Sequence, residues 1–256
     1  MVWLKRLVLM IQFLTRIPIP LNLDVKEEDF AWGTVFFPLV GLLVGLLMAI
    51  GYCIGVLLSY KLIPAVLAVL FQALITGVFH IDGLGDTFDG LFSNKSKDKM
   101  LEIMKDSRLG TNAAVAILFD VLLKILLLDQ ISRMLEPSLS YFLIFSIPIV
   151  GKVGILTSAA FSKYARPEGG LGRIIIDNVR VPQWLIGLIL AGGLLSLLLG
   201  KKGLLHMAAA LLVSFLFTGF VKKKIGGATG DTLGAVNEIC EICFLLFFKG
   251  IQNLMG

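Results

Sequence analysis

Long apolar runs cover most of this chain and restrict it to a protein embedded in a lipid bilayer. Of its 256 residues, 57% are hydrophobic and 16% are charged, and the mean hydropathy is +0.91. A soluble domain of this length does not need so much apolar surface, whereas a helix needs about 20 apolar residues to cross a bilayer. The chain is therefore expected to be an all-α, polytopic membrane helix bundle. Its seven candidate spans are 34–59, 62–79, 112–128, 140–161, 184–200, 204–221 and 239–255.

The first residues are expected to form a helix that lies in the membrane interface. The apolar stretch 7–14 is short and is followed by Arg16, Pro18 and Pro20, without a small-residue cleavage site, so it is not expected to be a cleaved signal. Apolar residues between 4 and 14 recur at helical spacing, with Lys5 and Arg6 off that face. A further hydrophobic segment packed on the bundle is the alternative interpretation.

The positions of lysine and arginine indicate how the chain is oriented. The N-terminal segment and every second gap between spans together hold 16 of these residues, against 5 on the opposite side. Because cytoplasmic loops carry the excess, the N-terminus is predicted to be cytoplasmic and the C-terminus outside. The net charge of +5 is then explained by this asymmetry, and it is not taken as a sign of nucleic-acid binding. We expect one integral-membrane domain over residues 1–256, and a homo-oligomer is left open.

Residues 77–90 read GVFHIDGLGDTFDG and carry the most informative polar cluster. Asp82, Asp86 and Asp89 fall at i, i+4 and i+7, which places all three carboxylates on one face of a helix. Their mutual repulsion is relieved by a hard divalent cation, and Mg²⁺ shares oxygen ligands with substrate phosphates. The cluster therefore predicts metal-assisted chemistry on a phosphorylated substrate, and an acidic helix end is the alternative.

Other residues of the same stretch fit a ligand site. Glycines at 83, 85 and 90 weaken an ordinary helix and suit the close approach of a ligand. His80, beside the cluster, is either a hydrogen-bonding or proton-carrying group or a structural histidine.

Three further polar loops or pairs complete the candidates. LEIMKDSRLG at 101–110 carries Glu102, Asp106 and Arg108, either a phosphate-gripping group or a surface helix with weak ion pairs. In GGATGDTLGA at 226–235, Gly230 and Asp231 begin a helix whose start either binds phosphate or is simply capped by Thr229 or Asp231. Arg166, in YARPEGGLGR at 164–173, is either a phosphate ligand or a positive-inside anchor.

One pair of charges lies within a candidate span. Asp120 and Lys124 are one helical turn apart, and a structural ion pair is the favoured interpretation over a substrate contact.

Six stretches together resemble the cobalamin synthase family of adenosylcobinamide-GDP ribazoletransferases, nearly from end to end. They are FLTRIPIP at 13–20, FPLVGLLVG at 37–45, G-x-F-H-x-D-G-L-x-D-T-x-D-G at 77–90, LEIMKDSRLGT at 101–111, YAR-x-E-G-L-G around 164–172 and TGDTLGA at 229–235. The clearest departure is YARPEGGLG, which has an added Pro167 and an extra glycine.

The resemblance implies a Mg²⁺-dependent enzyme of the inner membrane with its site on the cytoplasmic side. It would join adenosylcobinamide-GDP to α-ribazole or α-ribazole 5′-phosphate and give adenosylcobalamin or its 5′-phosphate, and GMP. On this basis the expected roles are catalysis by Asp82, Asp86, Asp89 and Asp231, metal ligation by Asp82, Asp86, Asp89 and Glu102, and substrate binding by Arg108, Asp106, Arg166, Gly230 and His80.

Three other functions remain open at this point. A CDP-alcohol phosphotransferase also uses an aspartate cluster, but its D-x-x-D-G-x-x-A-R run is absent, since Gly90 is followed by Leu-Phe-Ser-Asn. An aspartate-rich prenyltransferase also uses Mg²⁺ with a diphosphate. A cation-coupled transporter would need ionisable groups near the bilayer midplane, where only Asp120, Lys124 and Lys152 are expected.

Overall fold

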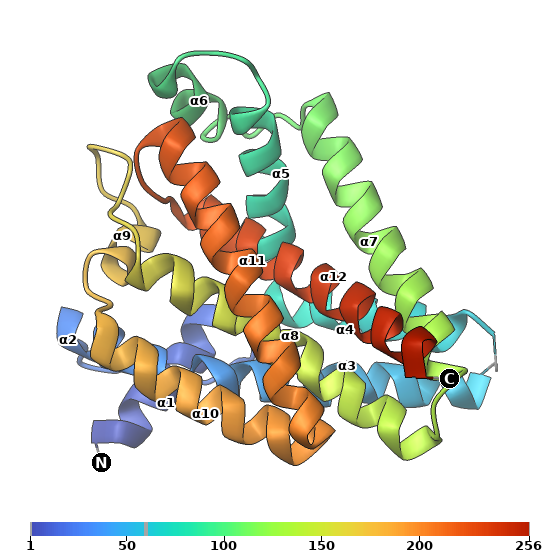
Figure 1. The fold of residues 1–256 in the computed structure, drawn as a ribbon. Helices are drawn as coiled ribbons and strands as arrows, with labels where there is room; N and C mark the ends of the chain where they lie inside the picture. The colour runs from blue at the N-terminus through green and yellow to red at the C-terminus, as the bar shows by residue number, and fades with distance from the viewer. Residues whose placement is uncertain (1, 59–60, 256) are drawn as a thin grey trace.

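Helices make up nearly all the regular structure of residues 2–58 and 61–255, which the computed structural model describes (Figure 1). They are α1 (Val2–Leu14), α2 (Glu27–Gly33), the 3₁₀ turn η1 (Thr34–Phe36), α3 (Phe37–Leu58), α4 (Ile63–Thr76), α5 (Phe79–Leu91), α6 (Lys97–Ile103), α7 (Thr111–Ser132), α8 (Pro137–Ala160), α9 (Leu171–Ile176), α10 (Val181–Leu199), α11 (Lys201–Ile225) and α12 (Gly230–Met255). Residue 59, the end of the first expected span, lies outside the described residues. The all-α membrane bundle is confirmed.

The number of spans differs from the seven expected. Within the described residues, five stretches are long and apolar enough to cross a bilayer: Glu27–Leu58, α7, α8, α10 and α11. A sixth results if α4 and α5, which meet at 87°, count as one broken span. The expected number of seven is not confirmed, because α4 has only 14 residues, fewer than the roughly 20 that a crossing needs. Helix α12, which was expected to hold the last span, is not among these stretches either, and its first half carries Asp231, Glu238 and Glu241.

Helix α8 forms the centre of the bundle. Of its apolar window, 78% is buried, against 28% for α7, α10 and α11. It packs against α3, α10, α11 and α12 (Figure 1), and Leu143, Ile147 and Val150 belong to the main core. The outer helices leave large apolar side chains exposed, such as Leu197 and Leu216, as lipid-facing surfaces do.

The N-terminal segment is a helix, as expected, but its charges are not all on the outer face. Arg6 is buried, and its Nε donates to Asp29 Oδ1 of α2 at 3.0 Å. Lys5 Nζ lies 2.5 Å from the other oxygen of Asp29. This ion pair fastens α1 to α2, and the placement of α1 in the membrane interface stays a prediction.

A strained turn separates α4 from α5. Gly77 and Val78 have φ angles of 64° and 58°, and the Val78 N–H donates to the Ala73 carbonyl at 2.9 Å, which ends α4. A positive φ is unusual for a β-branched residue, and such strain costs about 1–3 kcal/mol and clusters at functional sites. The turn sends α5 away from the direction of α4, so that the aspartate helix packs against α7 and α12.

A buried ion network lies where α7, α8 and α12 meet. Lys124 Nζ is 3.5 Å from Asp120 Oδ2, which confirms the expected pair, and it also binds Glu238 and lies 2.9 Å from Glu241 Oε2. Asn237 donates to both glutamates at 3.0 Å. Local spacing predicted only the Asp120 contact, because the two glutamates come from a helix more than 100 residues further along the chain.

Candidate active site

Two glycines bring α5 against the start of α12. A Cβ at Gly83 would lie 2.8 Å from the carbonyl oxygen of Asp231, and a Cβ at Gly234 would lie 3.0 Å from that of His80. Only glycine permits this close approach of two helix backbones. As a result Asp82 and Asp231, which are far apart in the sequence, line the same cavity.

The glycines of the aspartate stretch make room for neighbouring helices. A Cβ at Gly85 would lie 3.0 Å from Ile117 in α7, and one at Gly90 would lie 2.9 Å from the Met100 carbonyl in α6. Gly83 packs against the start of α12 and also lines the cavity described next. Gly85 and Gly90 therefore serve helix packing, and the close approach of a ligand stays a prediction for Gly83.

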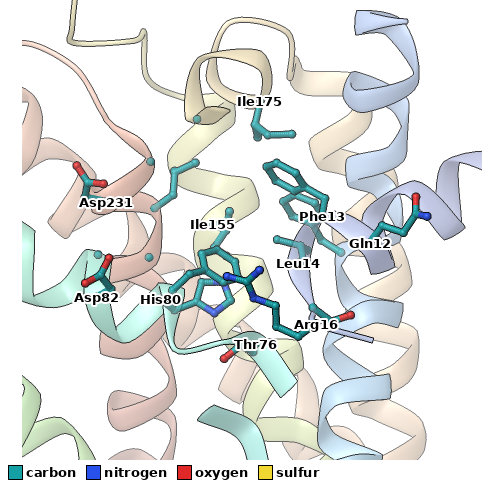
Figure 2. A pocket seen from close by; sticks show the side chains of 18 residues that line it. Gln12, Phe13, Leu14, Arg16, Thr76, His80, Asp82, Ile155, Ile175 and Asp231 are labelled. Atoms are coloured by element: carbon teal, nitrogen blue, oxygen red, sulfur yellow. The ribbon is translucent and has the colours of Figure 1, made fainter. Parts of the chain in front are cut away.

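A cavity of about 380 Å³ lies beside the aspartates (Figure 2). Its wall combines the end of α1 and residues just after it, the end of α4, the start of α5, α9 and the start of α12, with single residues from α3 and α8. The polar residues on this wall are Gln12, Thr15, Arg16, Thr76, His80, Asp82 and Asp231. The carboxylates are therefore at one edge of a largely apolar chamber.

The carboxylates of α5 differ in how they are bonded. Residues 79–91 are helical, so Asp82, Asp86 and Asp89 share one face, as predicted. Within the described residues, neither Asp82 nor Asp86 accepts a hydrogen bond. The negative charges of Asp231, Asp82 and Asp89 act unfavourably on an ionised Asp86, and Arg166 opposes them. Two carboxylates are thus free to take a cationic ligand.

Asp231 is held by a neighbouring loop. Arg166 Nη2 donates to Asp231 Oδ2 at 2.6 Å, and the Thr229 hydroxyl donates to the same oxygen at 3.2 Å. Thr229 Oγ1 also accepts the Thr232 N–H at 3.2 Å, so the cap of α12 is Thr229 and not Asp231. Oδ1 of Asp231 accepts no hydrogen bond from the described residues.

Asp89 serves a different part of the structure. Its two oxygens accept the backbone N–H groups of Gly110 at 2.7 Å and Ala113 at 2.9 Å, at the start of α7. This is the bonding of an N-terminal helix cap. Asp89 lines a shallow hollow with Asp106 and Arg108, outside the cavity of Asp82 and Asp231.

The candidates on α6 and the loop after it do not line the cavity. Arg108 Nη2 lies 2.5 Å from Asp106 Oδ2, and its hydrogen bonds lower the pKa of Asp106 to about 2. Glu102 is 67% exposed and lies 2.7 Å from Lys99. It shares a second hollow with Arg166 and Glu168, whose pKa is lowered by a hydrogen bond from Lys105.

Two of the remaining candidates are at the cavity. Gly230, the first residue of α12, lines it, and a Cβ on the facing Gly172 of α9 would lie 2.7 Å from the Gly230 Cα. His80 is 2% exposed and also lines the cavity. Its Nε2 has no hydrogen-bond partner among the described residues, so it is free for a ligand.

Arg16 also lines the cavity, although no role was predicted for it. Its motif, FLTRIPIP, carried part of the family resemblance. No local sequence pattern shows that the end of α1 lies against the α4–α5 turn. In the structure a backbone hydrogen bond joins the two segments: the Arg16 N–H donates to the Ile75 carbonyl at 2.6 Å.

The arrangement offers oxygen ligands but no complete metal site. In residues 2–58 and 61–255, no three His, Cys, Asp or Glu side chains are grouped closely enough to hold a metal ion. Asp82 and Asp86 supply two carboxylates without hydrogen bonds, and further ligands would have to come from substrate or water. The site can therefore bring a cation and an anionic substrate together at the edge of the cavity.

The fold and the site define an integral-membrane helical protein with a largely apolar cavity that carries carboxylates from α5 and α12 at one edge. Residues 6–249 match the family described as cobalamin-5-phosphate synthase, and the chain belongs to that family. The resemblance seen in its motifs is thus confirmed.

Relatives of similar length carry one name. "Adenosylcobinamide-GDP ribazoletransferase" of Clostridium novyi is 46% identical over 96% of this chain and 98% of its own length. Proteins of the same name from Acetivibrio thermocellus and Clostridium acetobutylicum are 44% identical (97% of this chain, 98% of theirs) and 39% identical (100% of each). No solved structure matches the chain.

Proposed function

We propose that this chain joins adenosylcobinamide-GDP to α-ribazole or its 5′-phosphate and releases GMP. The observation that carries the proposal is the meeting of Asp82 and Asp231, from two motifs of the family resemblance, at one cavity. Such a reaction needs a place for a nucleoside beside groups that manage phosphate charge, and this cavity provides both.

The chemistry is a displacement at phosphorus. The 3′-hydroxyl of the ribazole ribose attacks the phosphorus attached to cobinamide, a new P–O bond forms, and the P–O bond to GMP breaks. GMP leaves with the bonding electrons, and the hydroxyl proton passes to a carboxylate. Asp231 is suited to receive it, because it lines the cavity, Arg166 holds its Oδ2 at 2.6 Å, and its Oδ1 accepts no hydrogen bond from the described residues. Arg166 also remains beside the developing negative charge.

Mg²⁺ is the cofactor that fits this donor set. Its sites typically use one or two protein carboxylates, with waters and substrate phosphates as the other ligands, so the absence of a three-residue group among the described residues does not conflict with it. Asp82 and Asp86, which accept no hydrogen bonds there, would hold it. When bound, the ion would neutralise charge on the phosphate oxygens.

The direct test is GMP release by purified protein in detergent or lipid nanodiscs. We expect GMP, and a cobalamin product of matching amount, only when adenosylcobinamide-GDP and a ribazole acceptor are both present. Failure to form product from both substrates, with turnover of CDP-diacylglycerol or a prenyl diphosphate instead, would replace this function by one of the alternatives.

The site is proposed to face the cytoplasm from the inner membrane. The excess of lysine and arginine on the side of α6 supports this orientation. In a variant without native cysteines, a membrane-impermeant maleimide added to intact cells should label Met134→Cys and not Ser96→Cys. Both positions are exposed, so accessibility of the side chain is matched. The reverse labelling pattern would place the site outside.

A further inference from the structure

Arg16 is a cationic side chain of the cavity that is not neutralised by the protein. Its guanidinium has no hydrogen-bond or ion-pair partner among the described residues. Arg166, the other arginine near the aspartates, is already engaged by Asp231 at 2.6 Å. Figure 2 shows the Arg16 side chain directed towards His80, with Asp82 and Asp231 beyond it. A guanidinium without an ion-pair partner in a concave site can bind an anion such as a phosphate through two hydrogen bonds.

The turn that begins the aspartate helix also positions Arg16. The Arg16 N–H donates to Ile75 O at 2.6 Å, and a Cβ at Gly77 would lie 2.7 Å from Arg16 Cγ. The side chain therefore lies flat against a glycine that is also required by its φ of 64°. One structural element thus fixes the geometry between Arg16 and the aspartates that follow.

The cavity limits the size of the ligand that Arg16 would meet. Its volume of about 380 Å³ is at the small end of the roughly 300–1,000 Å³ found for small-molecule sites. This suits one nucleoside phosphate, whereas a corrin ring with its side chains is far larger. Phe13, Phe37 and Phe79 are on the wall, where they suit an aromatic base.

We propose that Arg16 binds the 5′-phosphate of the ribazole acceptor, with the nucleoside inside the cavity. This inference rests on the proposed function and specifies which substrate enters and how it is oriented. The 3′-hydroxyl and the 5′-phosphate project from opposite sides of the ribose ring. With the phosphate on Arg16, the hydroxyl turns towards Asp82 and Asp231. Arg16 also offsets the repulsion that these carboxylates exert on a phosphate.

The test compares two acceptors that differ only in this phosphate. Arg16→Ala should raise the KM for α-ribazole 5′-phosphate by about 10- to 100-fold, the effect of losing a charge-assisted hydrogen bond. The KM for α-ribazole and that for adenosylcobinamide-GDP should change less than about threefold. Arg16→Lys keeps the positive charge but loses the planar guanidinium that can donate two parallel hydrogen bonds, so its KM for α-ribazole 5′-phosphate should lie between those of wild type and Arg16→Ala. Arg133→Ala, which removes an exposed arginine paired with Asp129, is the matched control and should behave as wild type.

Two results would overturn the assignment. An equal loss with both acceptors would mean that Arg16 only supports the turn, and a raised KM for adenosylcobinamide-GDP alone would place its pyrophosphate on Arg16. Calorimetric binding of α-ribazole 5′-phosphate to wild type and Arg16→Ala separates this inference from the proposed function. Weaker binding by the variant supports the phosphate site even if no GMP is released, and equal binding rejects it.

Discussion

Asp82→Asn and Asp86→Asn should each lower turnover by roughly three orders of magnitude while the protein stays folded. Asparagine keeps the size and one oxygen but removes the charge that would hold Mg²⁺. Loss of several kcal/mol of electrostatic stabilisation gives this effect, at about 1.4 kcal/mol per tenfold. Because neither carboxylate has a hydrogen-bond donor within the described residues, its replacement leaves no donor there unsatisfied. The measurement is initial rate of GMP release, with unfolding followed on the same samples.

Titration with Mg²⁺ shows whether Asp82 and Asp86 bind the metal ion or act in some other way. Raising Mg²⁺ should restore part of the activity in at least one of the two variants. Asp24→Asn, at an exposed carboxylate in the loop before α2, is the control and should keep wild-type rate and Mg²⁺ dependence. Wild-type turnover and unchanged Mg²⁺ dependence in both test variants would reject the metal assignment.

Asp89 shows that three aspartates on one helical face can have different roles. The i, i+4, i+7 spacing correctly predicted one helical face, yet Asp89 accepts two backbone N–H groups at the start of α7. Spacing within a helix says which side chains share a face, but it cannot say which of them a neighbouring helix end will engage. The structure therefore supports a structural role for Asp89 beside the catalytic one that the sequence predicted.

Long-range packing decided the rest of the site. Asp82 and Asp231, which belong to two motifs far apart in the sequence, meet at one cavity. That meeting depends on Gly83 and Gly234, whose backbones touch helices distant in sequence. Glu102 and Arg108 were close to the cluster along the chain, but they sit on α6 and the following loop, with partners of their own. Sequence proximity was therefore a poor guide to proximity in space.

The expected span 62–79 shows the same limit in the backbone. Its apolar composition indicated one continuous helix, and Gly77 gave the only local sign of a stop. The left-handed Val78 and the 87° bend are held by contacts with the segment after α1, including the Arg16 N–H on Ile75. Tertiary contacts fix a conformation that residue preferences disfavour.

The buried ion network has one cation in contact with three carboxylates. Lys124 is 3% exposed and contacts Asp120, Glu238 and Glu241. Lys152 adds a second buried ammonium, which donates to Asn237 at 2.7 Å. Charges placed at this depth are costly unless they are paired. Since none of these residues lines the cavity of Asp82 and Asp231, we expect the network to determine stability and not turnover.

Lys124→Met should therefore destabilise the protein by about 3–5 kcal/mol, the usual cost of leaving a buried ion partner unpaired. Methionine is apolar and similar in length, so the change removes charge with little change in packing. Arg133→Met, at an exposed i, i+4 pair with Asp129, is the control and should cost about 0.5 kcal/mol or less. Denaturant unfolding in one detergent measures the stability of both variants.

Adding Glu238→Gln to Lys124→Met should recover part of the lost stability, because it removes one of the uncompensated charges. Equal stability of Lys124→Met and Arg133→Met would show that water or another cation already satisfies these carboxylates.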